Sequence, residues 1–196
     1  MTGKFIVFYG VNNLGKSTQA KLLVDKLNAR ELKAEYLKYP LYDLAPSGPL
    51  LNQYLRQGNP FGLSPREAQL LYAMNRWQYQ DELKAKLAAG TWLVAEDYTG
   101  TGLAWGVGAG VDEKFLLTVN DGLVVEDLAI LFDGQRFLEA VESGHQHETD
   151  NELTTKVRAA HQYFGERLHW PTVNANLTIE EVAEKIWQIV SQHFNF

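Results

Sequence analysis

Short apolar runs alternate with helical patterns along the chain. Residues 4–9 (KFIVFY) form a β-branched and aromatic run, which is typical of a strand buried on both faces. Four further runs predict strands, at residues 33–39, 91–97, 126–134 and 171–176. Helical spacing of apolar residues predicts helices at residues 16–30, 64–89 (as one helix or two), 151–168 and 178–194. This alternation predicts an α/β fold of three layers, in which helices cover both faces of a central parallel sheet of about five strands.

Two of these helices begin with recognisable capping residues. Ser64 precedes Pro65, and Glu67 follows three positions after the serine, which is the pattern of a capping box with proline at the first helical position. Thr178 suits the N-cap of the last helix. In parallel α/β sheets, ligands bind at the carboxyl ends of the strands, so we expect the functional residues there.

Length and composition restrict the function. The 196 residues (22.2 kDa) predict a single domain over residues 1–196. A formal net charge of −6 argues against long nucleic acid as a partner. The chain has no cysteine, which excludes disulfides and thiol catalysis and suits a reducing compartment. The first apolar run is too short for a signal peptide or a membrane span, so we expect a cytoplasmic protein without a membrane partner.

The strongest motif lies just after the first predicted strand. Residues 10–18 (GVNNLGKST) match the pattern G-x-x-x-x-G-K-[ST]. The glycines let backbone N–H groups turn inward around phosphate, and the following helix adds its positive end. Lys16 is expected to contact the β- and γ-phosphates of ATP, and the Ser17 hydroxyl to bind Mg²⁺. We therefore predict an ATP and phosphate site formed by Gly10, Asn12, Asn13, Gly15, Lys16, Ser17 and Thr18.

Four further segments make the motif more specific. In order they are YPLYDLAPSGPLLNQYLRQG, LLYAMNRWQYQDELKAKLAAG, EDYTGTGLAWG, and EDLAILFDG followed by GHQHETDNELTTKVRAAHQYF. Together with the phosphate loop, they resemble the thymidylate kinase family, P-loop kinases that act on nucleoside monophosphates. The resemblance covers nearly the whole chain. It implies the P-loop NTPase fold, phosphoryl transfer from ATP to dTMP with Mg²⁺, and a homodimer.

The resemblance also assigns the acceptor pocket. It implies that Tyr72 stacks on thymine and that Arg76 bonds the edge of the base. From the residues alone, these two side chains share one helix face, but they could equally be a core aromatic and a solvated arginine. Thr101 falls where a small hydroxyl residue lines the base pocket, and Trp105 where an aromatic ring packs on the deoxyribose. Residues 143–151, with His145 and His147, occupy the position of the lid over ATP.

Departures from the family pattern gather at charged positions. Glu96 and Asp97 stand where the family usually has Asp-Arg, and Tyr42 stands where a second arginine contacts the acceptor phosphate. Asn13 replaces a catalytic arginine that the lid does not supply either, and Asn12 replaces an acid near the acceptor sugar. Such arginines contribute on the order of 10³- to 10⁵-fold to phosphoryl-transfer rates. The altered residues therefore cast doubt on the usual acceptor.

Several roles and functions stay open at this point. Glu96 is expected to make a water-mediated Mg²⁺ contact, so Lys16, Glu96 and Asp97 form the candidate catalytic set. Asp97 is either a general base for an acceptor hydroxyl, or a side chain that pairs with a nearby basic residue or faces water. Arg136 is either a replacement phosphate-binding cation or a solvated side chain. The protein is thus a dTMP kinase, a kinase for a nucleoside or another uncharged alcohol, or a nucleotide-binding homologue that has lost catalysis.

Overall fold

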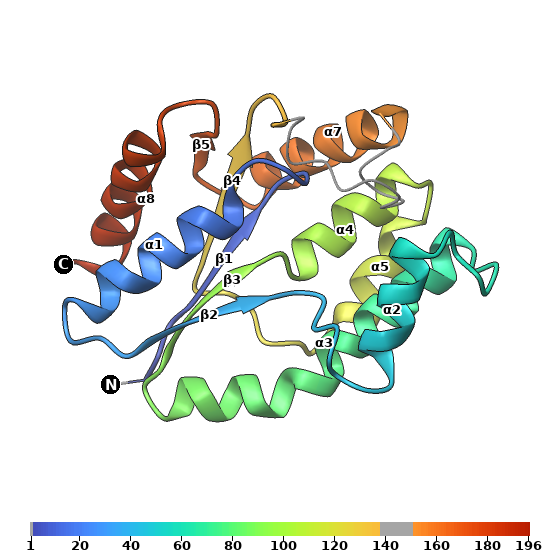
Figure 1. Cartoon of the computed structure of the whole chain (residues 1–196), viewed down its shortest axis with the longest axis horizontal. Helices are drawn as coiled ribbons and strands as arrows, with labels where there is room; N and C mark the ends of the chain where they lie inside the picture. Colours follow the sequence, from blue (N-terminus) through green and yellow to red (C-terminus); the bar gives the residue numbers. More distant parts are fainter. Residues whose placement is uncertain (1, 138–150) are drawn as a thin grey trace.

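A five-stranded parallel sheet forms the centre of the molecule (Figure 1). The computed structural model describes residues 2–137 and 151–196. The strands are β1 (Phe5–Tyr9), β2 (Ala34–Lys38), β3 (Trp92–Glu96), β4 (Leu128–Asp133) and β5 (Thr172–Asn174). Their order across the sheet is β2-β3-β1-β4-β5, and every neighbouring pair is parallel. The predicted five-stranded parallel α/β sheet is confirmed.

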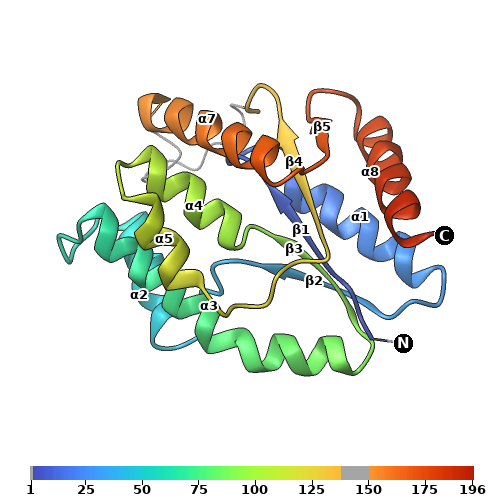
Figure 2. The same ribbon diagram turned by 180° about the vertical axis from the view of Figure 1, so that it is seen from behind.

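Helices cover both faces of this sheet (Figures 1 and 2). Phe5, Val7 and Tyr9 of β1 belong to one buried cluster, whereas Ile6 and Phe8 belong to another. The helices α1 (Lys16–Asn28) and α8 (Ile179–Phe194) pack together on one face, and α3 (Pro65–Ala88), α4 (Thr99–Gly108) and α7 (Asn151–Arg167) lie on the other. Two shorter helices, α2 (Ser47–Arg56) and α5 (Glu113–Asn120), pack against α3. No helix among the described residues is long and apolar enough to cross a membrane.

Four of these helices match the predicted ones, and three do not. Residues 64–89 form one helix, with both hydrogen bonds of the Ser64–Glu67 capping box, and Thr178 caps α8 in the same way. The sequence pattern did not predict α2, α4 or α5. Helix α4 has four glycines in its ten residues, and α2 begins Ser-Gly-Pro, so both have low intrinsic helix propensity. Packing against neighbouring helices stabilises them instead.

The register of the central strands determines where the functional residues meet. Phe8 of β1 lies beside Glu96 of β3, and Lys38 of β2 lies on the other side of Glu96. The backbone N–H of Asp97 continues this ladder by donating to the carbonyl oxygen of Phe8 at 3.1 Å. Because β1 leads directly into the phosphate loop, the two acids face that loop at the carboxyl edge of the sheet.

A buried asparagine attaches the segment after β2 to α3. The Asn75 side chain, fully buried, accepts from the backbone N–H of Leu41 at 2.8 Å and donates to the Leu41 carbonyl at 3.0 Å. The same amide donates to the Ser47 hydroxyl at 2.8 Å. These bonds hold the start of the segment that carries Tyr42 against the helix that carries Tyr72.

Replacing Asn75 by alanine should lower the free energy of unfolding by about 2–4 kcal/mol, because three hydrogen bonds are lost and buried backbone groups of Leu41 lose their partner. Urea denaturation followed by circular dichroism measures the change. Gln57→Ala, at an exposed position after α2, is the control and should change stability by less than about 0.5 kcal/mol. Equal stability of Asn75→Ala and the wild type would contradict this account.

Candidate active site

The phosphate loop adopts its conformation through residues that tolerate positive φ. Gly10 has φ 131°, and a Cβ there would lie 2.4 Å from the carbonyl oxygen of Phe132, so the position requires glycine. Gly15, at the start of α1, has φ 76°. Asn13 has φ 64° in the left-handed region, which asparagine accepts more readily than most residues. The loop therefore has the local geometry that its sequence motif predicts.

Lys16 lies deeply in this loop. Its Nζ donates to the carbonyl oxygens of Gly10 and Val11, both at 2.9 Å. It also lies 3.6 Å from Oδ1 of Asp97, and the lysine side chain is only 2% exposed. The ammonium is thus fixed between the loop and the end of β3, where it lines the same cleft as the rest of the loop.

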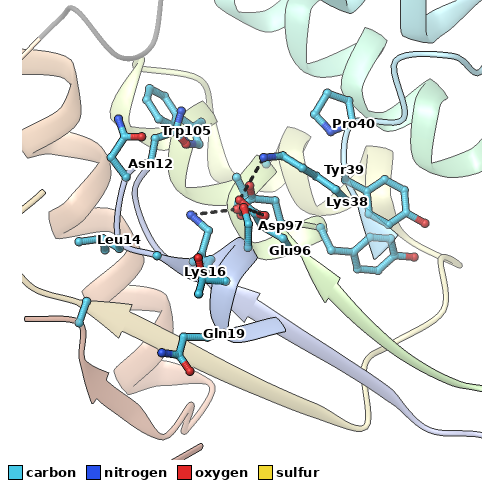
Figure 3. A pocket seen from close by; sticks show the side chains of 18 of the residues that line it. Asn12, Leu14, Lys16, Gln19, Lys38, Tyr39, Pro40, Glu96, Asp97 and Trp105 are labelled. Carbon is cyan, nitrogen blue, oxygen red and sulfur yellow. Dashed lines mark hydrogen bonds and ion pairs between the residues drawn. The ribbon is translucent and has the colours of Figure 1, made fainter. Parts of the chain in front are cut away.

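Glu96 accepts from several donors at once, of which Figure 3 shows Lys38. Its carboxylate is buried and bonds the hydroxyls of Ser17 at 2.5 Å and Tyr36 at 2.8 Å, and Nζ of Lys38 at 3.3 Å. Burial by itself would raise the pKa of Glu96, but the positive charges of Lys16 and Lys38, with the two hydroxyls, outweigh it and hold the pKa below its usual value. Glu96 is therefore ionised at neutral pH.

Asp97 lies in a different electrostatic environment. Its φ is 63°, so the backbone turns here and the side chain enters the cleft. Oδ1 accepts from the Thr101 hydroxyl at 2.8 Å and pairs with Lys16. Burial raises the pKa of Asp97, Lys16 opposes this, and the neighbouring charge of Glu96 adds to the rise. Of the interpretations drawn from the sequence, the structure shows the ion pair rather than a carboxylate that faces water, whereas the role of general base stays a prediction.

The oxygen atoms of Ser17 and Glu96 suit a magnesium ion. A hydroxyl and a carboxylate oxygen are hard ligands, and the two side chains meet at 2.5 Å beside the phosphate loop. Magnesium commonly takes only one or two protein ligands, with the remainder from phosphates and water. The described residues contain no group of three or more acidic, histidine or cysteine side chains that could hold a metal ion by themselves.

A cleft of about 660 Å³ joins these residues to the predicted acceptor site. It extends from the phosphate loop to α3 and α4, and apolar and polar side chains share its wall. Of the predicted residues within the described chain, it brings together Asn12, Asn13, Gly15, Lys16, Ser17, Thr18, Tyr42, Tyr72, Arg76, Glu96, Asp97, Thr101 and Trp105. Gly10 is not among the residues that line the cleft. His145 and His147 lie outside the described residues.

Arg76 lines the cleft as a buried cation. It is 4% exposed, and its Nε donates to Oδ1 of Asn120 at 3.0 Å. Its Nη2 is buried and has no hydrogen-bond partner among the described residues. Burial lowers the pKa of Arg76 to about 10, and nearby tyrosines, including Tyr98 and Tyr72, oppose this. The alternative of a solvated arginine is therefore wrong, and an unpaired donor beside Tyr72 lines the cleft.

Known proteins that are similar to the chain in sequence or in fold indicate its family. The family model described as thymidylate kinase matches residues 8–186. The chain belongs to the thymidylate kinase family. It is 33% identical to the thymidylate kinase of Synechococcus sp. (strain RCC307), over 98% of this chain and 97% of that protein, and 32% identical to that of Homo sapiens, over 94% and 88%. A solved thymidylate kinase from Candida albicans has the same fold, with a TM-score of 0.84 and 24% identity over 99% of this chain and 93% of the other.

Some residues that line the cleft of this family member were not predicted from its sequence. Lys38, at the end of β2, contacts Glu96 and lines the cleft. Arg56 and Gln69 line it too, and Oε1 of Gln69 is buried without a hydrogen-bond partner among the described residues. Gln69 is seven positions before Arg76, so helical spacing places both side chains on one face of α3. This spacing could have predicted Gln69 as a residue of the cleft.

Arg136 is excluded from the set of residues that line the cleft. Its Nη1 donates to the Thr154 hydroxyl of α7 at 3.4 Å, and the side chain is not part of the cleft wall. Among the described residues, Arg136 therefore does not supply a cation to the wall of the cleft.

Lys16→Met should weaken ATP binding at least about 10-fold, because a charged donor to phosphate is worth roughly 1.5–3 kcal/mol. Isothermal titration calorimetry with ATP and Mg²⁺ measures the loss. The matched control is Lys114→Met, which removes an exposed lysine from α5, away from the cleft, and should bind ATP as the wild type does. Wild-type affinity in Lys16→Met would remove Lys16 from the donor site.

Proposed function

We propose that the protein transfers the γ-phosphoryl group of ATP to dTMP, giving dTDP and ADP, with Mg²⁺ as the cofactor. The observation that carries this proposal is one cleft lined both by the phosphate loop and by Arg76, whose buried Nη2 has no hydrogen-bond partner within the part of the chain that the structure describes. An acceptor phosphate oxygen attacks the γ-phosphorus, and the bond to the β,γ-bridging oxygen breaks. Family membership supports phosphoryl transfer to a nucleotide in general.

The donor end provides positioning for this reaction. Backbone N–H groups of the loop and the ammonium of Lys16 would hold the β- and γ-phosphates. Ser17 would bind Mg²⁺ directly and Glu96 through water, and the bound ion would neutralise charge that develops on the phosphate oxygens. Asp97 would hold Lys16 at the side of the transferred group.

The acceptor end suits a thymine base. Thymine presents the O4 carbonyl at its edge, and Arg76 has a buried donor, Nη2, with no partner among the described residues. Leaving such a donor unpaired costs free energy, which a carbonyl oxygen from the ligand would recover. Tyr72 and Trp105 line the same cleft as aromatic surfaces for the base and the deoxyribose. Thr101 is fixed nearby by its bond to Asp97.

A second acceptor class is supported by one observation. Asp97 is a carboxylate within the cleft, where the family usually has an arginine for the acceptor phosphate. A nucleoside has a neutral hydroxyl that needs a general base, and a carboxylate with a raised pKa can take that proton. Thymidine is therefore the competing acceptor, and Asp97→Arg should then shift the preference towards the monophosphate.

An acceptor panel with ATP and Mg²⁺, read as ADP release, tests both. We expect turnover with dTMP to exceed that with thymidine, and Arg76→Met to lower kcat/KM for dTMP at least about 100-fold, because a buried charged contact to the base is lost. Arg167→Met, which removes an exposed arginine on α7, is the control. Thymidine turnover above dTMP turnover would favour the second class, and no ADP release by the folded protein with any acceptor would leave only nucleotide binding.

We also propose that the chain forms a homodimer in the cytoplasm, as the family resemblance implies. Leu70, Met74 and Trp77 lie on one face of α3 and are 47%, 36% and 43% exposed. Leu117 of α5 is 44% exposed, and Trp77 reaches that helix by donating to the Val119 carbonyl at 3.1 Å. Exposed apolar surface of this kind is typical of an interface between subunits.

Met74→Glu should convert the dimer to a monomer, because it would bury a carboxylate at the subunit interface. Light scattering after size-exclusion chromatography measures the mass. Val125→Glu, at a position 81% exposed in the segment between α5 and β4, should leave the mass unchanged. A monomeric wild type would contradict the proposed dimer.

A further inference from the structure

Four cations line the cleft within the described residues: Lys16, Lys38, Arg56 and Arg76. Lys16 is bound to the phosphate loop and Asp97. Arg76 is enclosed among tyrosines at the opposite end, with Nε bonded to Asn120. Arg56 is thus a cleft cation that neither the donor site nor the base site requires, and Lys38 pairs with Glu96 while its side chain stays 47% exposed.

Arg56 is held by the residue that replaces a family arginine. Its guanidinium carbon lies 4.7 Å from the centroid of the Tyr42 ring, which is within the range of a cation–π contact. Its Nη1 donates to Oδ1 of Asn52, one turn earlier in α2, at 2.9 Å. Tyr42 itself follows the segment that Asn75 attaches to α3. The ring therefore supports a guanidinium at the wall of the cleft where the family has its own arginine.

Lys38 lines the same cleft from the end of β2. Its ammonium pairs with Glu96 at 3.3 Å and is half-exposed, so a ligand in the cleft can reach it (Figure 3). Burial would lower the pKa of Lys38, but the charges of Glu96 and Asp97, with a smaller effect of Tyr42, raise it above its usual value. Lys38 therefore stays charged, and it screens the two acids from an incoming anion.

We propose that Arg56, supported by the Tyr42 ring, and Lys38 together bind the phosphate of the acceptor. In the family pattern, arginines at the positions of Asp97 and Tyr42 bind this phosphate. In this chain the two phosphate-binding cations lie instead at the end of α2 and the end of β2. A dianionic phosphate is thereby attracted to a site whose acids would otherwise repel it, which selects a nucleoside monophosphate over the nucleoside. This inference rests on the proposed function and specifies how its acceptor is recognised.

Equilibrium binding of dTMP and of thymidine to the full chain, without ATP, distinguishes contacts to the phosphate from contacts to the base and sugar. Arg56→Gln should raise the dissociation constant for dTMP about 10- to 100-fold and leave that for thymidine within about 2-fold, because only dTMP has a phosphate. Lys38→Met should change the two constants in the same selective way. The matched control is Arg66→Gln, since Arg66 also stacks on an aromatic ring, 3.7 Å from the Phe115 centroid, but does not line the cleft.

A rescue variant tests the geometry. Tyr42→Arg combined with Arg56→Gln restores one of the two arginines of the family pattern and should recover dTMP binding to within about 5-fold of the wild type. The proposal is overturned if Arg56→Gln binds dTMP as the wild type does, or if it weakens dTMP and thymidine equally, which would indicate a structural role. Turnover of dTMP by the wild type is measured separately, so a failure of the proposed kinase activity is distinguishable from a failure of the two cations to bind the phosphate.

Discussion

The site depends on two adjacent carboxylates that are buried together. Glu96 and Asp97 follow one another at the end of β3, with side chains 8% and 14% exposed. Two like charges so close would repel strongly in a low-dielectric surrounding, and each needs its own cation. Lys16 of the phosphate loop pairs with Asp97, and Lys38 of β2 pairs with Glu96. The parallel register of β1, β2 and β3 brings all four side chains to one edge of the sheet.

This arrangement also limits what else the site can bind. Two acids and two lysines together carry little net charge, so the cluster by itself offers no strong attraction to a dianionic acceptor. The opposite pKa directions of Glu96 and Asp97 follow from the same balance: Glu96 has more donors, while Asp97 takes the larger effect of burial. Additional positive charge must therefore come from outside the four, and within the described cleft only the arginines of α2 and α3 supply it.

Local patterns in the sequence predicted much of the fold and the local geometry of the phosphate loop. The loop, the five strands and the N-caps at Ser64 and Thr178 depend on neighbouring residues, which a sequence displays directly. The partner of Asp97 and the burial of Arg76 depend on contacts between distant segments, so both stayed undecided until the structure showed them. Lys38 and Arg56 were missed for the same reason, because nothing near them in the chain indicates that strand and helix ends meet at one cleft.

The missed helix α4 has a composition that the buried arginine helps to explain. A Cβ on Gly102 would lie 3.0 Å from Nη2 of Arg76, so a larger side chain would occupy the space of the guanidinium. At Gly106 and Gly108, a Cβ would lie 2.6 Å from Leu116 and 2.7 Å from Val157, so α5 and α7 also approach closely. The glycines that lower the helix propensity of α4 are thus the residues that let it pack beside α3 with a charged side chain between them. The low helix propensity of α4 and the space for the Arg76 guanidinium in the cleft therefore both follow from these glycines.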